Sequence, residues 1–407
     1  MRRPAFLALP LLIAFGLAAC DSGSSGPAEP DPPEVTISGV TEGTTYPGPV
    51  TIGIAIDRGT YTATVDGRAF LPGGTVSTPG PHTLVVTARD GLAETTRTIH
   101  FTIQGAPGGA LIIRMLNLGP NDGAPGDAIL ITDSTSAGRV HVLVDAGPSG
   151  LMSQDNGYVA RTLPAFGVDT LALMLLTHAH GDHYLGMTDV LNLFEVGTFL
   201  YNGQVRTLST YTSVIATANT RADSVIALAG SQTRDYTIGY AETAATLRFV
   251  PPLPTYINQN TNDGDLLNEG SVGMRLQLGT FDMFFTGDGE VEANLRWRTQ
   301  FPALTNNVDV LKVGHHGANN AIFDNGVFGT SAWVDHTSPN VSIISGNGVS
   351  HPRVNALNRL LGQPDNVTYC TNVHGMITIT VQRTGTYTVT VEKNAGMNCV
   401  PGSEATT

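Results

Sequence analysis

The pattern of hydrophobic and polar positions divides the chain into two parts. Between 34 and 104, short runs alternate apolar with polar residues, and turns rich in Gly and Pro separate the runs. Alternation with a period of two is typical of half-buried strands, and several short strands at this spacing predict an all-β sandwich. Between 110 and 395, apolar strands alternate with segments of helical character, which predicts one layered α/β domain. Residues 105–109, GAPGG, are the predicted linker.

The α/β pattern also predicts individual elements. Helices are expected at 158–166, at 183–194 and at about 209–229. A short, continuous apolar run between turn residues predicts a buried strand at 170–176. Further apolar strands are expected at 111–118, 128–134, 140–144, 281–285, 310–313 and 341–344. The last residues, 396–407, are expected to form a tail.

The N-terminal segment predicts export. A basic pair precedes an apolar stretch, 6–17, that is too short to be a good membrane span. Residues 1–20 end in LAAC, which matches the bacterial lipoprotein pattern in which Cys20 is lipidated; an ordinary cleaved signal peptide is the alternative. Residues 21–33 are acidic and rich in Ser, Gly and Pro, as expected of a disordered tether. We therefore expect a cell-envelope lipoprotein, facing the periplasm or the cell surface and held to the membrane through Cys20.

The charge balance and the cysteines narrow the picture further. The chain has 407 residues and a formal net charge of −13, and its only lysines are Lys312 and Lys393. This balance argues against a broad basic groove for nucleic acid, although a short local contact stays open. Cys370 and Cys399 are the only cysteines after Cys20. Because export leads to an oxidising compartment, they are predicted to form a disulfide.

The stretch after the strand at 170–176 carries the main candidate chemistry. It reads H-x-H-x-D-H, with four polar side chains at His178, His180, Asp182 and His183. Alternate side chains of an extended segment point the same way, so His178 and His180 can bind one ion. Asp182 and His183 follow at the bend and can face a second ion. Neutral imidazole and carboxylate are good ligands for zinc and similar divalent metals. A surface loop that happens to be rich in histidine is the alternative.

Other apolar strands also end in His or Asp. These ends carry Asp145, Asp288, the adjacent His315 and His316, and His351. Side chains placed at several strand ends predict one convergent site at an edge of the sheet. Since two close cations need an anion between them, Asp288 is a candidate for that position, and a helix N-cap is its alternative.

The sequence THAHGDHYLG resembles the signature of the metallo-β-lactamase fold superfamily. The order HxHxDH, NxxS, TGD, LKVGHHG, SHP and TxxHGxI closely resembles the soluble hydrolase domain of the DNA-uptake channel protein ComEC and its stand-alone relatives, over about 111–391. Exported phosphorylcholine esterases of the same superfamily share the HHG element. Residues 34–104, with GTYTATVDGRAF and GPHTLVVTARDG, resemble bacterial Ig-like domains. The resemblance implies an αββα sandwich with a dinuclear metal centre at one edge.

The resemblance also implies which residues bind metal. His178 and His180 are expected to hold one ion, and Asp182 and His183 the other. Asp288 is expected to bridge the two ions. The expected cofactors are two divalent cations, zinc or alternatively manganese.

Other residues are expected to support the metals or face the substrate. His316 is expected to be a further ligand and His315 to face the substrate, with the order of these two histidines left open. Asp145 is a candidate to orient a ligand histidine, and a turn-forming role is its alternative. Asn268 stands where many family hydrolases have a ligand histidine, which puts β-lactam hydrolysis in doubt.

The activity that the resemblance implies is hydrolysis of a phosphate ester or phosphodiester, in a small molecule or a polymer, by metal-bound hydroxide. Asp182, His315 and His351 are the expected catalytic residues, and either of the two histidines can donate a proton to the oxyanion or the leaving group. Two alternatives remain. One is a ComEC-like nuclease linked to DNA uptake, and the other is a metal-binding cell-surface module with little catalysis.

Overall fold

The computed structural model describes most of the chain after the N-terminal segment. The described residues are 31–46, 50–76, 80–103, 109–118, 126–135, 138–148, 150–151, 155–230, 233–239 and 244–405. The predicted signal segment with Cys20, the tether up to residue 30 and residues 105–108 of the linker lie outside them.

Residues 31–103 form sheets of their own. The strands are β1 (Val35–Ser38), β2 (Thr44–Tyr46), β3 (Val50–Thr51), β4 (Gly53–Ile56), β5 (Thr60–Val65), β6 (Arg68–Ala69), β7 (Thr75–Val76), β8 (Gly80–Asp90) and β9 (Ala93–Ile103). Five of them pair in the order β2-β9-β8-β5-β6, while β1 pairs with β4 and β3 with β7. Alternate residues of β8 are buried, and Ile52, Leu84 and Phe101 lie in the core of this part. The all-β character is as expected, and the Ig-like class stays a prediction.

The rest of the described chain is mixed α/β. Its strands are β10 (Gly109–Met115), β11 (Ile129–Thr135), β12 (Gly138–Val144), β13 (Gly150–Leu151), β14 (Asp155–Asn156), β15 (Thr170–Leu176), β16 (Glu195–Tyr201), β17 (Ala222–Ala227), β18 (Arg234–Ile238), β19 (Ala245–Val250), β20 (Gly273–Leu278), β21 (Phe281–Phe285), β22 (Val310–Lys312), β23 (Val341–Ile344), β24 (Val367–Cys370), β25 (Ile377–Gln382) and β26 (Tyr387–Val391). Its helices are α1 (Tyr158–Thr162), η1 (Leu163–Phe166), α2 (Gly181–Tyr184), α3 (Met187–Leu193), α4 (Ser209–Arg221), α5 (Pro254–Ile257), α6 (Gly264–Glu269), α7 (Val291–Gln300), α8 (Pro302–Thr305), η2 (Gly314–Gly317), η3 (Asn319–Ala321), α9 (Ala332–Thr337), α10 (Val354–Leu361) and α11 (Thr371–His374). None of the helices in the described ranges is long and apolar enough to cross a membrane.

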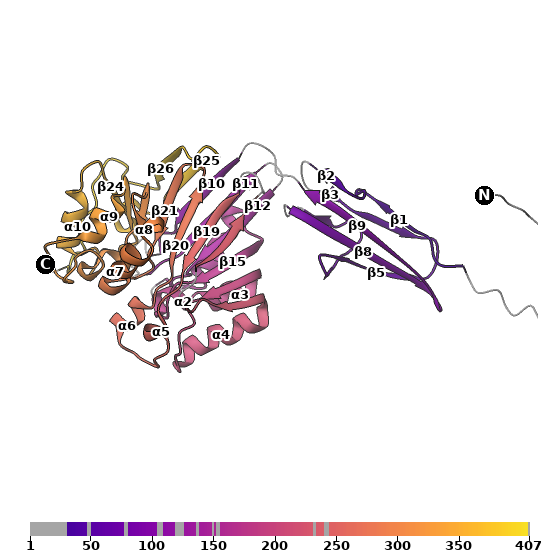
Figure 1. Cartoon of the computed structure of the whole chain (residues 1–407), viewed down its shortest axis with the longest axis horizontal. Helices are drawn as coiled ribbons and strands as arrows, with labels where there is room; N and C mark the ends of the chain where they lie inside the picture. The colour runs from indigo at the N-terminus through magenta and orange to yellow at the C-terminus, as the bar shows by residue number, and fades with distance from the viewer. Residues whose placement is uncertain are drawn as a thin grey trace, which may run out of the picture.

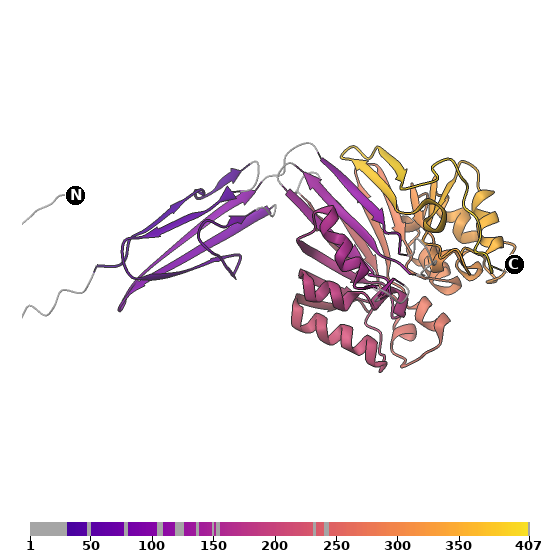
Figure 2. The ribbon, with the colours of Figure 1, turned by 180° about the vertical axis from the view of Figure 1, so that it is seen from behind.

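Two sheets face each other, and helices cover their outer faces (Figures 1 and 2). The first has the order β17-β16-β15-β12-β11-β10-β25-β26, and the second the order β18-β19-β20-β21-β22-β23-β24. Leu173 and Met283 lie in the apolar core between the sheets. Met174 packs in a second core with residues of α3 and α4, and Phe284 packs in a third with Trp297 of α7. The order helix–sheet–sheet–helix is the one that the family resemblance implies.

The parallel strands bring several loops to one edge. In the first sheet β12, β15, β16 and β17 run parallel, and in the second β21, β22, β23 and β24 do. Within each sheet, the carboxyl ends of parallel neighbours lie on the same side. The loops that follow β15, β21 and β22 therefore carry the candidate side chains of distant sequence segments toward one place.

Two predicted helices differ from the observed ones. The helix expected at about 209–229 ends at Arg221, because 222–227 is the strand β17, which pairs with β16 through Val225 and Ile226. β-Branched side chains and an unpaired sheet edge favour the strand there. The single helix expected at 183–194 is observed as α2 and α3. A Cβ on Gly186, between them, would lie 2.1 Å from the carbonyl oxygen of Ala146, so the chain turns where two backbones meet closely.

Candidate metal centre

The H-x-H-x-D-H stretch lies on a rigid support. The last four residues of β15 are fully buried, and Thr177 leads from the strand into the loop. His178 and His183 are also fully buried, whereas Asp182 keeps 27% of its side chain exposed. His180 has an extended backbone and is followed at once by α2. The buried strand and the short helix thus hold both ends of the loop.

Asp288, in the loop after β21, is shared by two groups of possible ligands. One group is His178, His180 and Asp288, and the other is Asp182, His183, Asp288 and His316. The Oδ2 atom of Asp288 lies 3.1 Å from Nε2 of His183, 3.3 Å from Nε2 of His316 and 3.7 Å from Nε2 of His178. The structure therefore brings the six predicted ligands together in two groups that meet at one carboxylate.

Hydrogen bonds on the outer side of the rings orient the histidines. The Nδ1 atom of His183 lies 2.7 Å from Asp145, and that of His316 lies 3.1 Å from the carbonyl oxygen of Ser345. The Nδ1 atom of His178 lies 3.1 Å from the hydroxyl of Thr177, which itself donates to Asp145. With Nδ1 as the donor, the Nε2 lone pair of each ring points inward, where a cation could bind it; that of His178 meets Nδ1 of His180 at 3.0 Å. Asp145 thus contacts His183, one of the predicted ligands.

The electrostatics of the centre fit bound cations. Although burial opposes their charge, Asp288 and Asp145 raise the pKa of His183 well above its ordinary value. Against the same effect of burial, Asp288 and Asp182 raise the pKa of His316 to about 10. The carboxylates therefore attract positive charge strongly. In addition, Oδ1 of Asp288 and Nε2 of His316 are buried without a hydrogen-bond partner of good geometry. Since leaving such atoms unpaired costs free energy, the donor set fits two divalent cations.

His315 points to different neighbours from those of His316. Both residues have left-handed backbones, with φ of 39° and 53°, which is unusual for side chains of this size. His315 belongs to neither ligand group. Its Nδ1 atom donates to Oε1 of Glu290 over 2.7 Å, and Glu290 also accepts from the amide of Asn268 over 2.7 Å. The strained turn therefore separates a histidine of the candidate ligand groups, His316, from one that contacts a buried carboxylate, His315.

His351 lies at the rim of the centre. Its ring centroid is 5.4 Å from that of His315 and 6.2 Å from that of His316. Burial and the charge of His316 lower the pKa of His351 to about 3, so the ring is neutral at neutral pH. The three histidines thus line one side of the site.

Two buried acids of the centre escaped the sequence reasoning, Asp127 and Glu290. Asp127 lies 2.6 Å from Nζ of Lys312, with both side chains buried, and 3.9 Å from Nδ1 of His316. A lysine within an apolar strand signals that a buried partner exists, because a lone buried charge is very costly. Nothing in the spacing identifies that partner. The sequence did contain a signal that could have identified Glu290, because this residue follows the TGD element by two positions.

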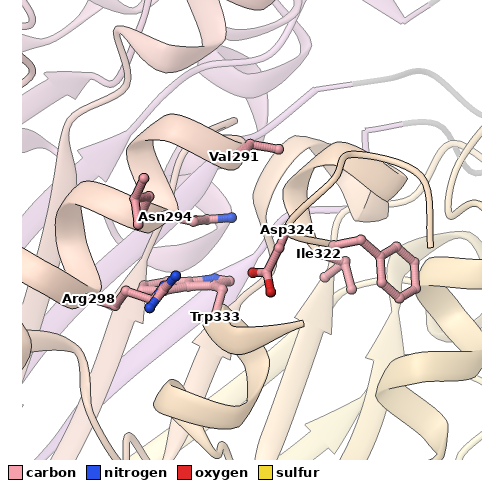
Figure 3. Close-up of a pocket in the computed structure, with 8 residues that line it drawn as sticks. Val291, Asn294, Arg298, Ile322, Asp324 and Trp333 are labelled. Atoms are coloured by element: carbon pink, nitrogen blue, oxygen red, sulfur yellow. The ribbon is translucent and has the colours of Figure 1, made fainter. Parts of the chain in front are cut away.

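Other features lie away from the centre. Cys370 and Cys399 form a disulfide. A cavity of about 70 Å³ between α7 and α9 is lined by side chains including Asn294, Asp324 and Trp333 (Figure 3). A larger hollow of about 760 Å³ includes Arg68 and His141 in its lining. Neither lining contains any of the six ligands, so we place the candidate chemistry at Asp288.

Comparisons with protein-family models and with curated proteins give no match. Among solved structures, a mutant of the CmlA beta-hydroxylase is similar at 14% identity and a TM-score of 0.40, over 68% of this chain and 54% of that one. The Rm3 metallo-beta-lactamase is similar at 14% identity and a TM-score of 0.30, over 51% and 80%. AidC, a dizinc quorum-quenching lactonase, is similar at 11% identity and a TM-score of 0.28, over 79% and 97%. This chain thus spans about half the length of the beta-hydroxylase. Because these TM-scores are below 0.5, the interpretation of the site rests on the chain's own residues.

Proposed function

We propose that the protein is a metal-dependent hydrolase of the metallo-β-lactamase superfamily that cleaves a phosphate ester or phosphodiester. The observation that carries the proposal is the position of Asp288, which belongs to both groups of ligands. A single carboxylate between two sets of histidines is the arrangement that a dinuclear centre needs, since it offsets the repulsion between the ions. The motif order in the sequence and the helix–sheet–sheet–helix layers support the same assignment.

The chain's own residues define how the site works. His178, His180, Asp182, His183, Asp288 and His316 would hold two cations, zinc or manganese. Such cations, when bound, make a water molecule acidic enough to attack an ester at neutral pH. Asp145 keeps His183 in the tautomer that offers Nε2 inward. Because most of these side chains are buried among the surrounding loops, little water competes with a cation for them.

His315 is the proposed proton donor to the leaving group. Its Nδ1–H is held by Glu290, which leaves Nε2 directed elsewhere, and 26% of its side chain is exposed. A ring that is anchored on one side and reachable on the other suits proton transfer to a substrate oxygen. His351, next to it, is the second donor.

Phosphoester specificity is supported by the resemblance rather than by geometry. The HHG element at 315–317 is shared with esterases and with the ComEC-like domains, and Asn268 replaces a histidine that many other family hydrolases use. The amide of Asn268 donates to Glu290 over 2.7 Å, so Asn268 helps to fix the carboxylate that holds the proposed donor.

Metal analysis together with a substrate panel tests the proposal. Purified protein should carry close to two equivalents of zinc or manganese. It should release nitrophenolate from bis-p-nitrophenyl phosphate or from p-nitrophenyl phosphorylcholine faster than it opens nitrocefin. DNA and RNA belong in the same panel, because preferential cleavage of either would favour the nuclease alternative. Metal-loaded protein with no turnover of any phosphoester would overturn the assignment and favour a binding module.

A further inference from the structure

We propose that the C-terminal segment 394–405, tied to β24 by the Cys370–Cys399 disulfide, positions His351 at the metal centre. The segment follows the last strand, β26, and returns to the loop 347–353, which carries His351. Beyond the pairing of Cys399 with Cys370, the sequence predicts only a tail at 396–407. The catalytic part of this inference rests on the proposed function, whereas the structural part does not.

The first half of the segment is fastened to α11 and β24. Cys399 is joined to Cys370, and both are buried. His374 lies fully buried beside them, with Nδ1 accepting from the backbone N–H of Cys370 at 3.0 Å and Nε2 donating to the carbonyl oxygen of Met397 at 3.0 Å. Asn394 adds a side-chain bond to the carbonyl oxygen of Val373 at 2.8 Å. One covalent bond and two part-buried hydrogen bonds, to Met397 and from Asn394, therefore fix the path of the chain.

The second half is bonded to the loop of His351. The backbone N–H groups of Gly402, Ser403 and Glu404 donate to the carbonyl oxygens of Pro352, Gly348 and Val349, over 3.1, 2.9 and 2.7 Å. These bonds reach both sides of His351. The loop has internal support from Asn347, whose side chain accepts from the backbone N–H of His351 at 2.9 Å. The segment and Asn347 together hold the backbone from which the His351 ring reaches His315 and His316.

The disulfide holds the part of the segment that immediately precedes these contacts. It therefore acts on the site from a distance. Cys399 precedes the three donors by only a few residues. Without the bond, the segment keeps only hydrogen bonds, and each of these competes with water. The His351 loop should then open more often, while the six metal ligands, which lie on other loops, stay in place.

A pair of glycine variants in the same segment tests the contact. A Cβ at Gly402 would lie 2.4 Å from the carbonyl oxygen of Val349 and 2.9 Å from the amide nitrogen of His351, so Gly402→Ala must displace the backbone. A Cβ at Gly396 would meet nothing within 4 Å, which makes Gly396→Ala the matched control. We expect amide hydrogen exchange of 347–353 to quicken about tenfold or more in Gly402→Ala and to stay at the wild-type rate in Gly396→Ala. Equal protection in the two variants would overturn the proposal.

Turnover then separates positioning from a merely structural contact. Gly402→Ala should lower kcat to about the level of His351→Ala, and the double variant should be no slower, because both changes remove the same group. Metal content should stay as in the wild type. Additive losses would refute positioning through His351. If the wild-type protein hydrolyses none of the substrates, the proposed function fails, but the exchange measurements still decide whether the segment holds the loop.

A cysteine variant tests the role of the disulfide. Cys370→Ala/Cys399→Ala should show the same rapid exchange of 347–353 as Gly402→Ala. Wild-type protein denatured, reduced and refolded without oxidant should do so too. The alternative is a metal at Cys370, His374 and Cys399, whose ligand atoms lie within reach of one another. If the reduced protein binds a third zinc and residues 347–353 keep their protection from hydrogen exchange, a metal holds the segment in place. The part of the proposal that concerns the disulfide is then wrong.

Discussion

Asp288 is the residue on which the candidate centre depends most. Its side chain is almost fully buried, and His183 and His316 lower its pKa well below the ordinary value in spite of burial. It is therefore ionised at neutral pH. Removing it leaves buried histidines, and any bound cations, without the charge that balances them.

We predict that Asp288→Ala loses most of its metal together with its activity. The physical reason is that both ligand groups share this carboxylate. Metal content by elemental analysis, after reconstitution and removal of free metal, is the measurement. Two bound equivalents in the purified variant would show that the bridging role is wrong.

His315→Ala gives the opposite prediction. His315 lies outside both ligand groups, so metal content should stay close to wild type. Turnover of a substrate with a poor leaving group should fall by about 10²–10⁴-fold, as expected for loss of a general acid. On a nitrophenolate substrate, which needs little protonation, the defect should shrink. If the variant loses metal as fully as Asp288→Ala does, the roles of His315 and His316 must be exchanged.

At the scale of elements, α7 depends on a buried acid of α6. Glu269 accepts from the backbone N–H groups of Glu292 and Ala293 in the first turn of α7, over 2.9 and 2.6 Å. Burial, which outweighs these bonds, raises the pKa of Glu269 from 4.5 to about 7. The folded protein then binds more protons than the unfolded chain between these two pH values. By linkage, stability should fall as the pH rises through this window.

We predict that Glu269→Gln removes this part of the pH dependence. The full effect of the shift on the free energy of unfolding is about 3 kcal/mol, gained below pH 4.5 and lost above 7. Urea unfolding of metal-free wild type and variant at pH 5 and pH 8 is the measurement. The wild type should lose more stability than Glu269→Gln between these pH values. Identical changes in the two proteins would place the pKa of Glu269 near its ordinary value.

The elements also show how far the sequence alone leads. The strand at 170–176 was predicted to the residue, because an apolar run between turns has few other solutions. The His and Asp residues that follow strand ends, which the structure brings together around Asp288, were predicted for the same reason. The segment 222–227 was taken for helix, because its pairing with β16 is a contact that local pattern does not encode. Asp127 was missed likewise, since its partner Lys312 is distant in the sequence.

At the scale of the whole molecule, the α/β part of the chain depends little on residues 31–103. Arg68 of β6 forms an ion pair with Asp223 of β17, but both side chains are more than half exposed. Exposed ion pairs contribute little to stability. The sheets of residues 31–103 share no strand with those of the α/β part among the described residues.

A chain that begins at Gly108 is therefore predicted to fold and to keep its metal and its activity. Its thermal unfolding should match the corresponding transition of the longer chain, and Arg68→Ala in the longer chain serves as the control for the ion pair. An insoluble or metal-free product would show that the first part belongs to the core of the α/β domain.

Export gives the last prediction. If Cys20 is lipidated, Cys20→Ser should accumulate as an unprocessed precursor, and globomycin should have the same effect on the wild type. Immunoblotting of membrane fractions measures both. Normal maturation of Cys20→Ser would point to an ordinary signal peptidase.

The ligands of the candidate centre come from both halves of the sandwich. His178 to His183 follow a strand of the first sheet, while Asp288 and His316 follow strands of the second. If the proposed function holds, the two cations would therefore link the two sheets as well as serve as cofactors. A metal ion that binds only the folded state stabilises that state by mass action, so a shortage of metal would lower the stability of the whole domain. If the chain is exported, as its N-terminal segment predicts, degradation of the unfolded state would then tie the lifetime of the protein to its supply of metal.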